Sequence, residues 1–494
     1  MGKRVHIAKL VSGVPGFDEL LGGGVPEFSF NLIAGTPGSG KTTLAHQLMF
    51  SLANPQRRAL FFTVLGEPPL KMLRYQQQFS YFDFDKVETS IRFVNLAADM
   101  VDGNFDRVLA RIIDEVQEYS PSLVFVDSFR SVVQAAPSGE HGFSDLQQFI
   151  QQLGMQMTSW QATTFLIGEY LQPDTESGPV FTVADGILWL SQLVRGDSMV
   201  RKIQVVKMRG ANQKLGSHTF RIDSNGVQVF PRAVMQAPNA PAGLLGSERL
   251  STGVAELDAM MGGGVPAAYS LLVAGPSGSG KTILATEFLA EGARRGEHGI
   301  IAAFEKSPNQ LSSLKLNELV SSGKVGVINT RTLDLSIDEI LHDLVTMIDA
   351  TNARRVVIDS LSGFELALSS IFRDDYREAL YRLVDILTGK GVTVMMTTEL
   401  EDRYDVLRFS SYGNAFLADA IVNQRYVEIN GSFRRVMSVV KVRASGHSKD
   451  MRFYDIVDGR TVIGERVTGY TGVLTGKPLR TMRSGRIRKP LKIS

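Results

Sequence analysis

The sequence predicts two tandem α/β domains, each with a mostly parallel central sheet and antiparallel edge strands. The chain is 494 residues long, more than one ordinary hydrophobic core accommodates. Similar segments recur 240 positions apart, as Gly35 and Gly275 illustrate. Within each copy, short β-branched apolar runs alternate with stretches of helical period. Near the end of the first copy, "KIQVVKMR" and "HTFRI" follow each other closely, which predicts an antiparallel pair at the edge.

The internal repeat indicates duplication of a whole domain. "SGVPGFDELLGGGVP", which starts at Ser12, matches "TGVAELDAMMGGGVP", which starts at Thr252. Three more pairs follow in the same order: "LVFVDS" and "VVIDS", "VADGILWL" and "LADAIVNQ", "VVKMRG" and "VVKVRA". Chance does not preserve such an order. We therefore expect domains at residues 1–240 and 241–470, joined through the segment 230–249 with its three prolines.

The composition is typical of a soluble globular protein, with 44% hydrophobic and 21% charged residues. No apolar run reaches 18 residues, so we expect no membrane span. The first residues lack the apolar core of a signal peptide. Cysteine is absent, which excludes disulfides and thiolate metal sites and fits a reducing, cytoplasmic compartment.

The charge is concentrated in a basic tail at residues 471–494. The whole chain carries +2, and residues 477–494 hold seven basic residues and no acidic one, so the rest of the chain carries −5. Three roles are open: phosphate contacts with nucleic acid, docking of a regulatory protein partner, and a solvated tail without a role. The acidic body and the lack of an aromatic residue in the tail argue against nucleic acid.

Two stretches, "GTPGSGKT" and "GPSGSGKT", match the phosphate-loop motif, and each lies between an apolar strand and a helical stretch. The glycines let backbone N–H groups wrap around phosphate oxygens. The lysine would reach the β- and γ-phosphates, and the following threonine would bind Mg²⁺. The predicted phosphate-binding residues are Gly35, Thr36, Pro37, Gly38, Ser39, Gly40, Lys41, Thr42 and Thr43, and Gly275, Pro276, Ser277, Gly278, Ser279, Gly280, Lys281, Thr282 and Ile283.

A second strand in each copy ends in an acidic residue, Asp127 in "SLVFVDS" and Asp359 in "RRVVIDS". We expect these carboxylates to order the Mg²⁺ together with Thr42 and Thr282. The alternative is that each carboxylate caps a helix.

The phosphate loops, "VIDS", "MTTE", "LADAIV" and the late "K-x-R-G/A" motif together resemble the KaiC family of double-domain ATPases in the RecA superfamily. The resemblance spans roughly residues 5–465. It implies RecA-like P-loop NTPase folds in both domains, ATP as the nucleotide, and a double-ring homohexamer with ATP between subunits. Our leading hypothesis, motivated by the tandem set of sites, is a hexameric ATPase that works as a switch or timer whose nucleotide state governs partner binding.

The same resemblance implies that basic residues on a late strand reach the neighbouring subunit's nucleotide. The matching residues are Lys207 and Arg209 in the first domain and Lys441 and Arg443 in the second, and the stretch "KVRASGHSKD" matches the family's second domain with His447 and Lys449 in place. Such cations would neutralise the charge that develops during phosphoryl transfer. The alternative is a solvated strand face.

KaiC-like domains carry two consecutive glutamates after the second strand. In the second domain the pair is Glu305-Lys306, and Glu305 is our candidate water activator. In the first domain Leu65 and Gly66 occupy the pair, and Glu67 follows. Either Gly66 lets the chain bend so that Glu67 reaches the site, or the first domain binds ATP and hydrolyses it poorly.

The adjacent serine and threonine that KaiC phosphorylates on itself correspond here to Ala415 and Phe416. Ser410 and Ser411 lie a few residues upstream and would have to act as shifted acceptors. We expect an ATPase with little autophosphorylation. A serine/threonine autokinase and a nucleic-acid-dependent ATPase are the alternatives.

Overall fold

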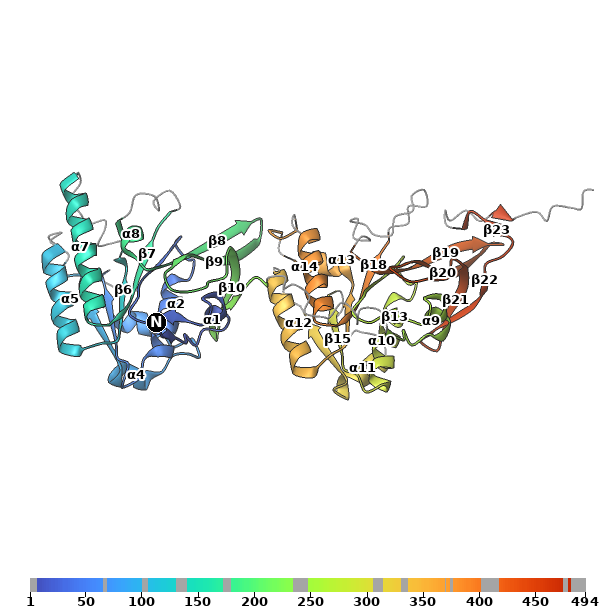
Figure 1. Cartoon of the computed structure of the whole chain (residues 1–494), viewed down its shortest axis with the longest axis horizontal. Coiled ribbons are helices and arrows are strands. Elements are labelled where there is room, and N and C mark those ends of the chain that lie inside the picture. The colour runs from blue at the N-terminus through green and yellow to red at the C-terminus, as the bar shows by residue number, and fades with distance from the viewer. Residues whose placement is uncertain are drawn as a thin grey trace, which may run out of the picture. The chain divides into compact units, whose positions relative to one another are not determined.

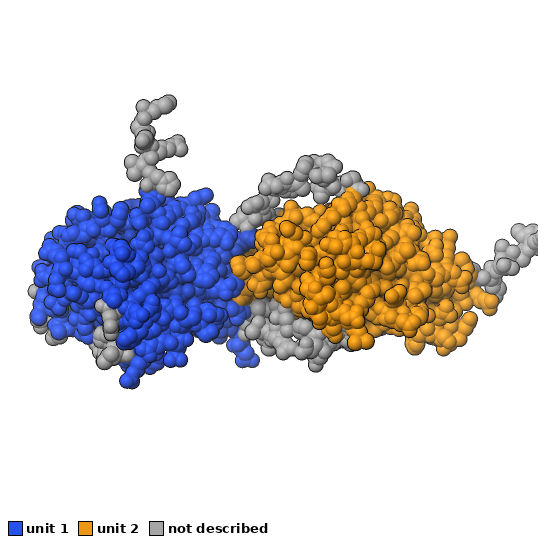
Figure 2. Space-filling model, turned by 90° about the horizontal axis from the view of Figure 1, so that it is seen from below, with its two compact units in different colours: residues 1–233 blue, residues 234–494 orange. Residues whose placement is uncertain are grey.

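A computed structural model describes residues 7–64, 69–99, 105–129, 140–171, 179–233, 248–304, 314–329, 336–368, 370–373, 376–400, 417–473 and 479–480. The chain divides into two compact units, unit 1 at residues 1–233 and unit 2 at residues 234–494, which Figure 2 distinguishes by colour. The segment between the repeats that we predicted to be a linker falls largely outside the described residues. None of the described helices is both long and apolar enough to cross a lipid bilayer.

The described strands of unit 1 form a nine-stranded sheet in the order β11-β10-β9-β8-β3-β7-β6-β4-β5 (Figure 1). The pairs β8-β3, β3-β7, β7-β6, β6-β4 and β4-β5 are parallel, whereas β8-β9, β9-β10 and β10-β11 are antiparallel. The strands are β3 Phe30–Gly35, β4 Ala59–Thr63, β5 Ile91–Asn95, β6 Leu123–Asp127, β7 Thr163–Glu169, β8 Gly186–Arg195, β9 Ser198–Met208, β10 Ser217–Asp223 and β11 Gly226–Phe230. The antiparallel pair predicted from the sequence lies within β9 and β10.

Helices cover both faces of this sheet because its parallel strands are apolar on both faces. In β4, Phe61 packs into one core cluster with Leu48 of α2, and Leu60 packs into another with Leu109 of α5 and Ile150 of α7. The helices of unit 1 are α1 Phe17–Leu20, α2 Lys41–Leu52, α3 Pro69–Gln76, α4 Phe84–Thr89, α5 Phe105–Tyr119, α7 Glu140–Ser159 and α8 Pro179–Val183. A two-stranded sheet is formed by β1 Lys9–Leu10, which precedes α1, and β2 Val25–Pro26, which follows it.

Unit 2 repeats this topology in its described strands, with the order β16-β15-β17-β18-β14-β19-β20-β21-β22. The pairs β16-β15, β15-β17, β17-β18, β18-β14 and β14-β19 are parallel, whereas β19-β20, β20-β21 and β21-β22 are antiparallel. The strands are β14 Ser270–Gly275, β15 Gly299–Ala303, β16 Val325–Asn329, β17 Arg355–Asp359, β18 Thr393–Glu399, β19 Ala420–Ile429, β20 Ser432–Val442, β21 Met451–Val457 and β22 Arg460–Arg466. The predicted fold class is therefore confirmed, with an antiparallel edge longer than one pair.

The main helices of unit 2 follow the same strands as in unit 1: α10 follows β14, α12 follows β16 and α14 precedes β18, as α2 follows β3, α5 follows β5 and α7 precedes β7. Ser336 caps α12 by accepting from the Glu339 backbone N–H, and the Glu339 carboxylate accepts from the Ser336 N–H in return. The helices are α9 Ala255–Met260, α10 Lys281–Arg294, α11 Leu314–Ser321, α12 Ile337–Thr351, α13 Leu361–Ala367 and α14 Tyr376–Gly389. The remaining strands are β12 Arg249–Leu250, β13 Val265–Pro266, β23 Tyr470–Thr471 and β24 Leu479–Arg480.

Candidate functional site

The first phosphate loop connects the end of β3 to the start of α2. Three positions in the loop require glycine, because Gly35, Gly38 and Gly40 have φ values of 149°, 71° and 98°. A Cβ on Gly35 would lie 1.8 Å from the Leu190 carbonyl oxygen, and one on Gly40 would lie 2.6 Å from Ile222. The loop can therefore pack against the late strands while its N–H groups and the α2 N-terminus face an anion.

The polar groups of this loop fit a phosphate ligand. The Thr36 and Ser39 hydroxyls are buried and have no hydrogen-bond partner among the residues that the structure describes. Lys41 is only 6% exposed, and its Nζ donates to the Thr36 carbonyl at 2.8 Å. Burial lowers the pKa of Lys41, and this effect outweighs the opposing influence of the Glu169 and Asp127 carboxylates. Phosphate oxygens would accept from the Thr36 and Ser39 hydroxyls and from Lys41, and their negative charge would favour the protonated form of the lysine.

Thr42 and Asp127 lie together beside the first loop. The Thr42 hydroxyl donates to Asp127 Oδ2 at 2.8 Å, although the two residues come from α2 and from the end of β6. A hydroxyl and a carboxylate are oxygen ligands of the kind that Mg²⁺ prefers beside a nucleotide. Bound Mg²⁺ would offset the negative charge of the phosphate oxygens.

The second loop opens on a cavity of about 730 Å³ in unit 2. Lys281 Nζ donates to the Gly275 and Pro276 carbonyls at 2.9 and 2.8 Å. Both Thr282 and Asp359 line the cavity, but Asp359 Oδ1 accepts from Thr397 of β18. The other predicted loop residues that line it are Ser277, Gly278, Gly280 and Ile283.

The acidic residues that end β7 and β18 lie beside the loops, and we did not assign them to the site from the sequence. Glu169 ends β7, opposite Gly35 in the sheet, and its carboxylate lies 4.0 Å from Lys41 Nζ. Glu399 ends β18, opposite Gly275, and lines the cavity. The sequence contains a signal for both glutamates, because "LIGE" and "MTTE" end the same strand in the two copies of the repeat. By contrast, no motif marks Arg460, which reaches the cavity from the start of β22.

The late-strand arginines are held at the opposite end of the central strands. Arg209 donates to Asp185 Oδ1 at 3.0 Å, and Asp185 Oδ2 accepts from the N–H of Phe30, the first residue of β3. In unit 2, Arg443 likewise donates to Asp419 Oδ1 at 2.9 Å. Six strand residues span about 16 Å, so these guanidinium groups do not approach the phosphate loop of their own unit.

The late-strand lysines accompany the arginines. Lys207 Nζ donates to the Thr182 carbonyl at 3.3 Å, and Lys441 Nζ to the Ala418 carbonyl at 2.7 Å. The pKa of each lysine is lowered, first by desolvation and then by the adjacent arginine. His447 and Lys449 follow β20 in a segment that is anchored by the Ser448 N–H on the Met260 carbonyl.

Both predicted water activators, Glu67 and Glu305, lie outside the described residues, as do Ser410 and Ser411. The strands that precede the two glutamates are described. Thr63, the last residue of β4, pairs with Asp127, and Ala303, the last residue of β15, pairs with Asp359. Each of these strands therefore ends beside the acidic residue that we expect to bind Mg²⁺.

His46 makes the helix after the first loop sensitive to pH. Its ring is fully buried and stacks on Phe61 with centroids 4.6 Å apart, and burial lowers its pKa to about 3. Below pH 6.5 the unfolded chain takes up a proton that the folded unit does not, so unit 1 loses stability as the pH falls. From pH 7.5 to 5.5 we expect His46 to cost about 1.4 kcal/mol.

This loss can be measured by urea unfolding followed through tryptophan fluorescence, because both tryptophans, Trp160 and Trp189, belong to unit 1. The His46→Leu variant should show a correspondingly smaller loss between the two pH values. Unit 2 has Thr286 at the equivalent position. An equal pH dependence in the variant and the parent would contradict the assignment.

Comparison with known proteins places this sequence in one family. The family described as "ATPase: KaiC" matches residues 10–234 and 250–467. The chain is 28% identical to the circadian clock protein KaiC3 of Synechocystis over 97% of this chain and 96% of that protein. It is 26% identical to the circadian clock oscillator protein KaiC of Picosynechococcus over 96% and 93%. The chain therefore belongs to the KaiC family of tandem-domain ATPases.

Proposed function

We propose that this protein is an ATP-hydrolysing switch or timer that assembles as a double-ring homohexamer, with nucleotide and Mg²⁺ bound between subunits in both rings. Membership of the KaiC ATPase family implies that it binds and hydrolyses ATP. The observation that carries the proposed assembly is the position of the late-strand cations. They stand at the start of β3 and β14, whereas the phosphate loops follow the ends of these strands.

A shared site explains why cations are held so far from their own loop. Arg209 and Arg443 remain 64% and 59% exposed despite their ion pairs, so their guanidinium groups are accessible to another subunit. In a closed ring each subunit presents the same two surfaces, so a cation that cannot serve its own loop can serve the next one. There, Lys441 and Arg443, with His447 and Lys449, would stabilise the charge on the transferred phosphoryl group.

Hydrolysis also needs a group that orients water. We propose Glu305 for this role in unit 2, and Glu67 remains the candidate in unit 1. The described structure adds Glu169 beside the first loop, and Glu399 and Asp458 in the lining of the unit 2 cavity. The output of the switch would pass to a regulatory protein, and the basic tail is our proposed docking segment. We expect the protein to act in the cytoplasm and without nucleic acid.

Mixed rings test the shared site. Subunits with Lys281→Ala keep the cations, and subunits with Arg443→Ala keep the loop, so each alone should hydrolyse little ATP in unit 2. Both subunits carry Lys41→Ala so that unit 1 contributes nothing. In a 1:1 mixture about a quarter of the interfaces combine an intact loop with an intact arginine, and about a quarter of the parental rate should return.

Light scattering with and without ATP accompanies the activity measurement. The proposal predicts an oligomer of six chains in the presence of ATP. A mixture that stays inactive although mixed rings form would contradict the shared site. A chain that stays monomeric at activity-supporting ATP concentrations would contradict the ring itself.

A further inference from the structure

A second cavity, of about 670 Å³, lies in unit 1 away from the phosphate loop. Its lining includes Leu10 of β1 and Thr163, the first residue of β7. Further lining residues follow the C-terminal ends of α2, α5 and α7 at residues 54–57, 120–122 and 160–161. The cavity therefore opens at the amino end of the parallel strands, the end opposite the nucleotide site.

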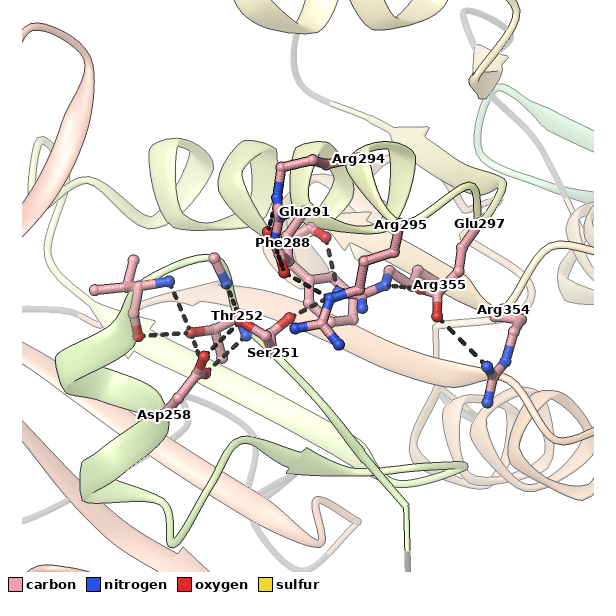
Figure 3. A network of polar contacts seen from close by, with 12 residues as sticks. Ser251, Thr252, Asp258, Phe288, Glu291, Arg294, Arg295, Glu297, Arg354 and Arg355 are labelled. Carbon is pink, nitrogen blue, oxygen red and sulfur yellow. Dashed lines mark hydrogen bonds and ion pairs between the residues drawn. The ribbon is translucent and has the colours of Figure 1, made fainter.

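In unit 2 the equivalent corner is bridged by ion pairs. Arg354 contacts Glu248 at 2.7 Å and Glu297 at 3.4 Å, and Lys390 contacts Asp349 at 2.8 Å. Figure 3 shows Glu297 between Arg354 and the buried Arg355. These pairs join the segments just before β12 and β17, the turn after α10, the last turns of α12 and the residue that follows α14.

The repeat allows the two corners to be compared residue by residue. The Phe28 N–H donates to Thr163 Oγ1 in unit 1, as the Ala268 N–H donates to Thr393 Oγ1 in unit 2, which fixes the correspondence. The counterparts of Glu248, Glu297, Asp349, Arg354 and Lys390 are Ala8, Arg57, Gln117, Ser122 and Trp160. None of the three ion pairs can form in unit 1, because each lacks at least one of its charged partners.

The unit 1 residues offer an aromatic face and free polar groups. Trp160 packs against the core on one side and lines the cavity. Among the described residues, neither the Arg57 guanidinium nor the Trp160 indole N–H has a hydrogen-bond partner. Gln117 and Gln161 add exposed amides, which both donate and accept. A flat ring with donors and acceptors along its edge matches this set, by stacking on the indole and bonding to the amides.

The charge of the corner selects against a triphosphate. Three helices end there, and their C-termini carry partial negative charge. Arg57 contributes one positive charge, and Glu27 in the lining contributes one negative charge. We propose that this cavity is a binding site for a neutral nucleobase or nucleoside, separate from both ATP sites. Its volume lies within the range of small-molecule pockets.

The full chain tests this with Trp160 as the only reporter. In a Trp189→Phe background, the two phosphate loops are first saturated with a non-hydrolysable ATP analogue and Mg²⁺. Adenosine, guanosine, cytidine and uridine are then titrated while Trp160 fluorescence is followed. We expect saturable quenching by at least one nucleoside, and binding weaker by about tenfold for its triphosphate. The absence of saturable quenching by all four nucleosides overturns the proposal.

The matched control transplants the unit 2 ion pairs into unit 1. The variant Ala8→Glu/Arg57→Glu/Ser122→Arg should lose the quenching while it retains binding of the ATP analogue, which shows that it is folded. A second variant, Gln117→Asp/Trp160→Lys, is tested by equilibrium dialysis with the nucleoside that bound best, and it should also lose binding. Nucleoside binding that persists in either folded variant assigns the signal to another site and overturns the proposal.

Discussion

Replacing Lys281 by alanine should reduce ATP hydrolysis in unit 2 by about 100-fold or more, because removal of one preorganised donor from a transition-state site has costs of this order. Lys281 lies beside the phosphate loop with its Nζ on two loop carbonyls, at a position from which it can turn to the β- and γ-phosphates. Lys41 holds the same position in unit 1. Phosphate release should therefore be measured for each single variant and for the double variant.

The two single variants also show how much of the ATP turnover each unit contributes. Activity that remains in Lys281→Ala belongs to unit 1, and it decides whether that unit hydrolyses ATP or only binds it. Lys86→Ala in unit 1 and Lys324→Ala in unit 2 are matched controls outside the loops and should leave the rate unchanged. Full activity in the Lys41→Ala/Lys281→Ala double variant would contradict the catalytic role of both loops.

The second large effect is on stability, and its centre is the buried Arg355 of unit 2. The Arg355 side chain is fully buried, and its Nε donates to Glu297 Oε2 at 2.6 Å. The guanidinium also donates to the Ser251 and Phe288 carbonyls and lies over the Phe288 ring (Figure 3). Glu297→Ala should lower the free energy of unfolding of unit 2 by about 3–5 kcal/mol, because it leaves a buried charge without its partner.

Circular dichroism during urea unfolding measures this loss, and tryptophan fluorescence checks that unit 1 is unchanged, because unit 2 has no tryptophan. Glu248→Gln is the matched control at the exposed end of the same network. Both Glu248 and Arg354 are more than 40% exposed, so this control should cost less than about 1 kcal/mol. The double variant Glu297→Ala/Arg355→Leu should recover much of the loss, since unit 1 has Leu123 at the position of Arg355. Equal effects of Glu297→Ala and Glu248→Gln would contradict this account.

Several features of the site were predictable because they depend on local requirements of the backbone. Gly38 and Gly40 must adopt positive φ for the loop to curve, and Lys41 and Thr42 must follow at once. Such constraints appear in the sequence as fixed spacings, and the duplication displays them twice. The family resemblance reached the same conclusion from the same residues, and the match over both repeats confirms the family.

Other features required the order and register of the strands. Glu169 approaches Lys41 because β7 pairs with β3, although the two residues are far apart in the sequence. Asp127 reaches Thr42 because β6 also ends at this edge of the sheet. Asp127 was predictable from the sequence because it follows a run of apolar residues. Glu169, which ends β7, was not distinguished in the sequence from an ordinary polar residue after a strand.

The sequence by itself indicated a duplicated α/β fold with two phosphate loops, because glycine spacing, apolar period and repeat order are read directly along the chain, and its resemblance to the KaiC family indicated an ATPase. Only the tertiary structure decided which end of the sheet each charged residue occupies. It placed Arg209 and Arg443 beside the first residues of β3 and β14, and it set Trp160 in a corner that unit 2 closes with ion pairs. The physical reason is that these positions follow from pairing between distant strands, which no short stretch of sequence records.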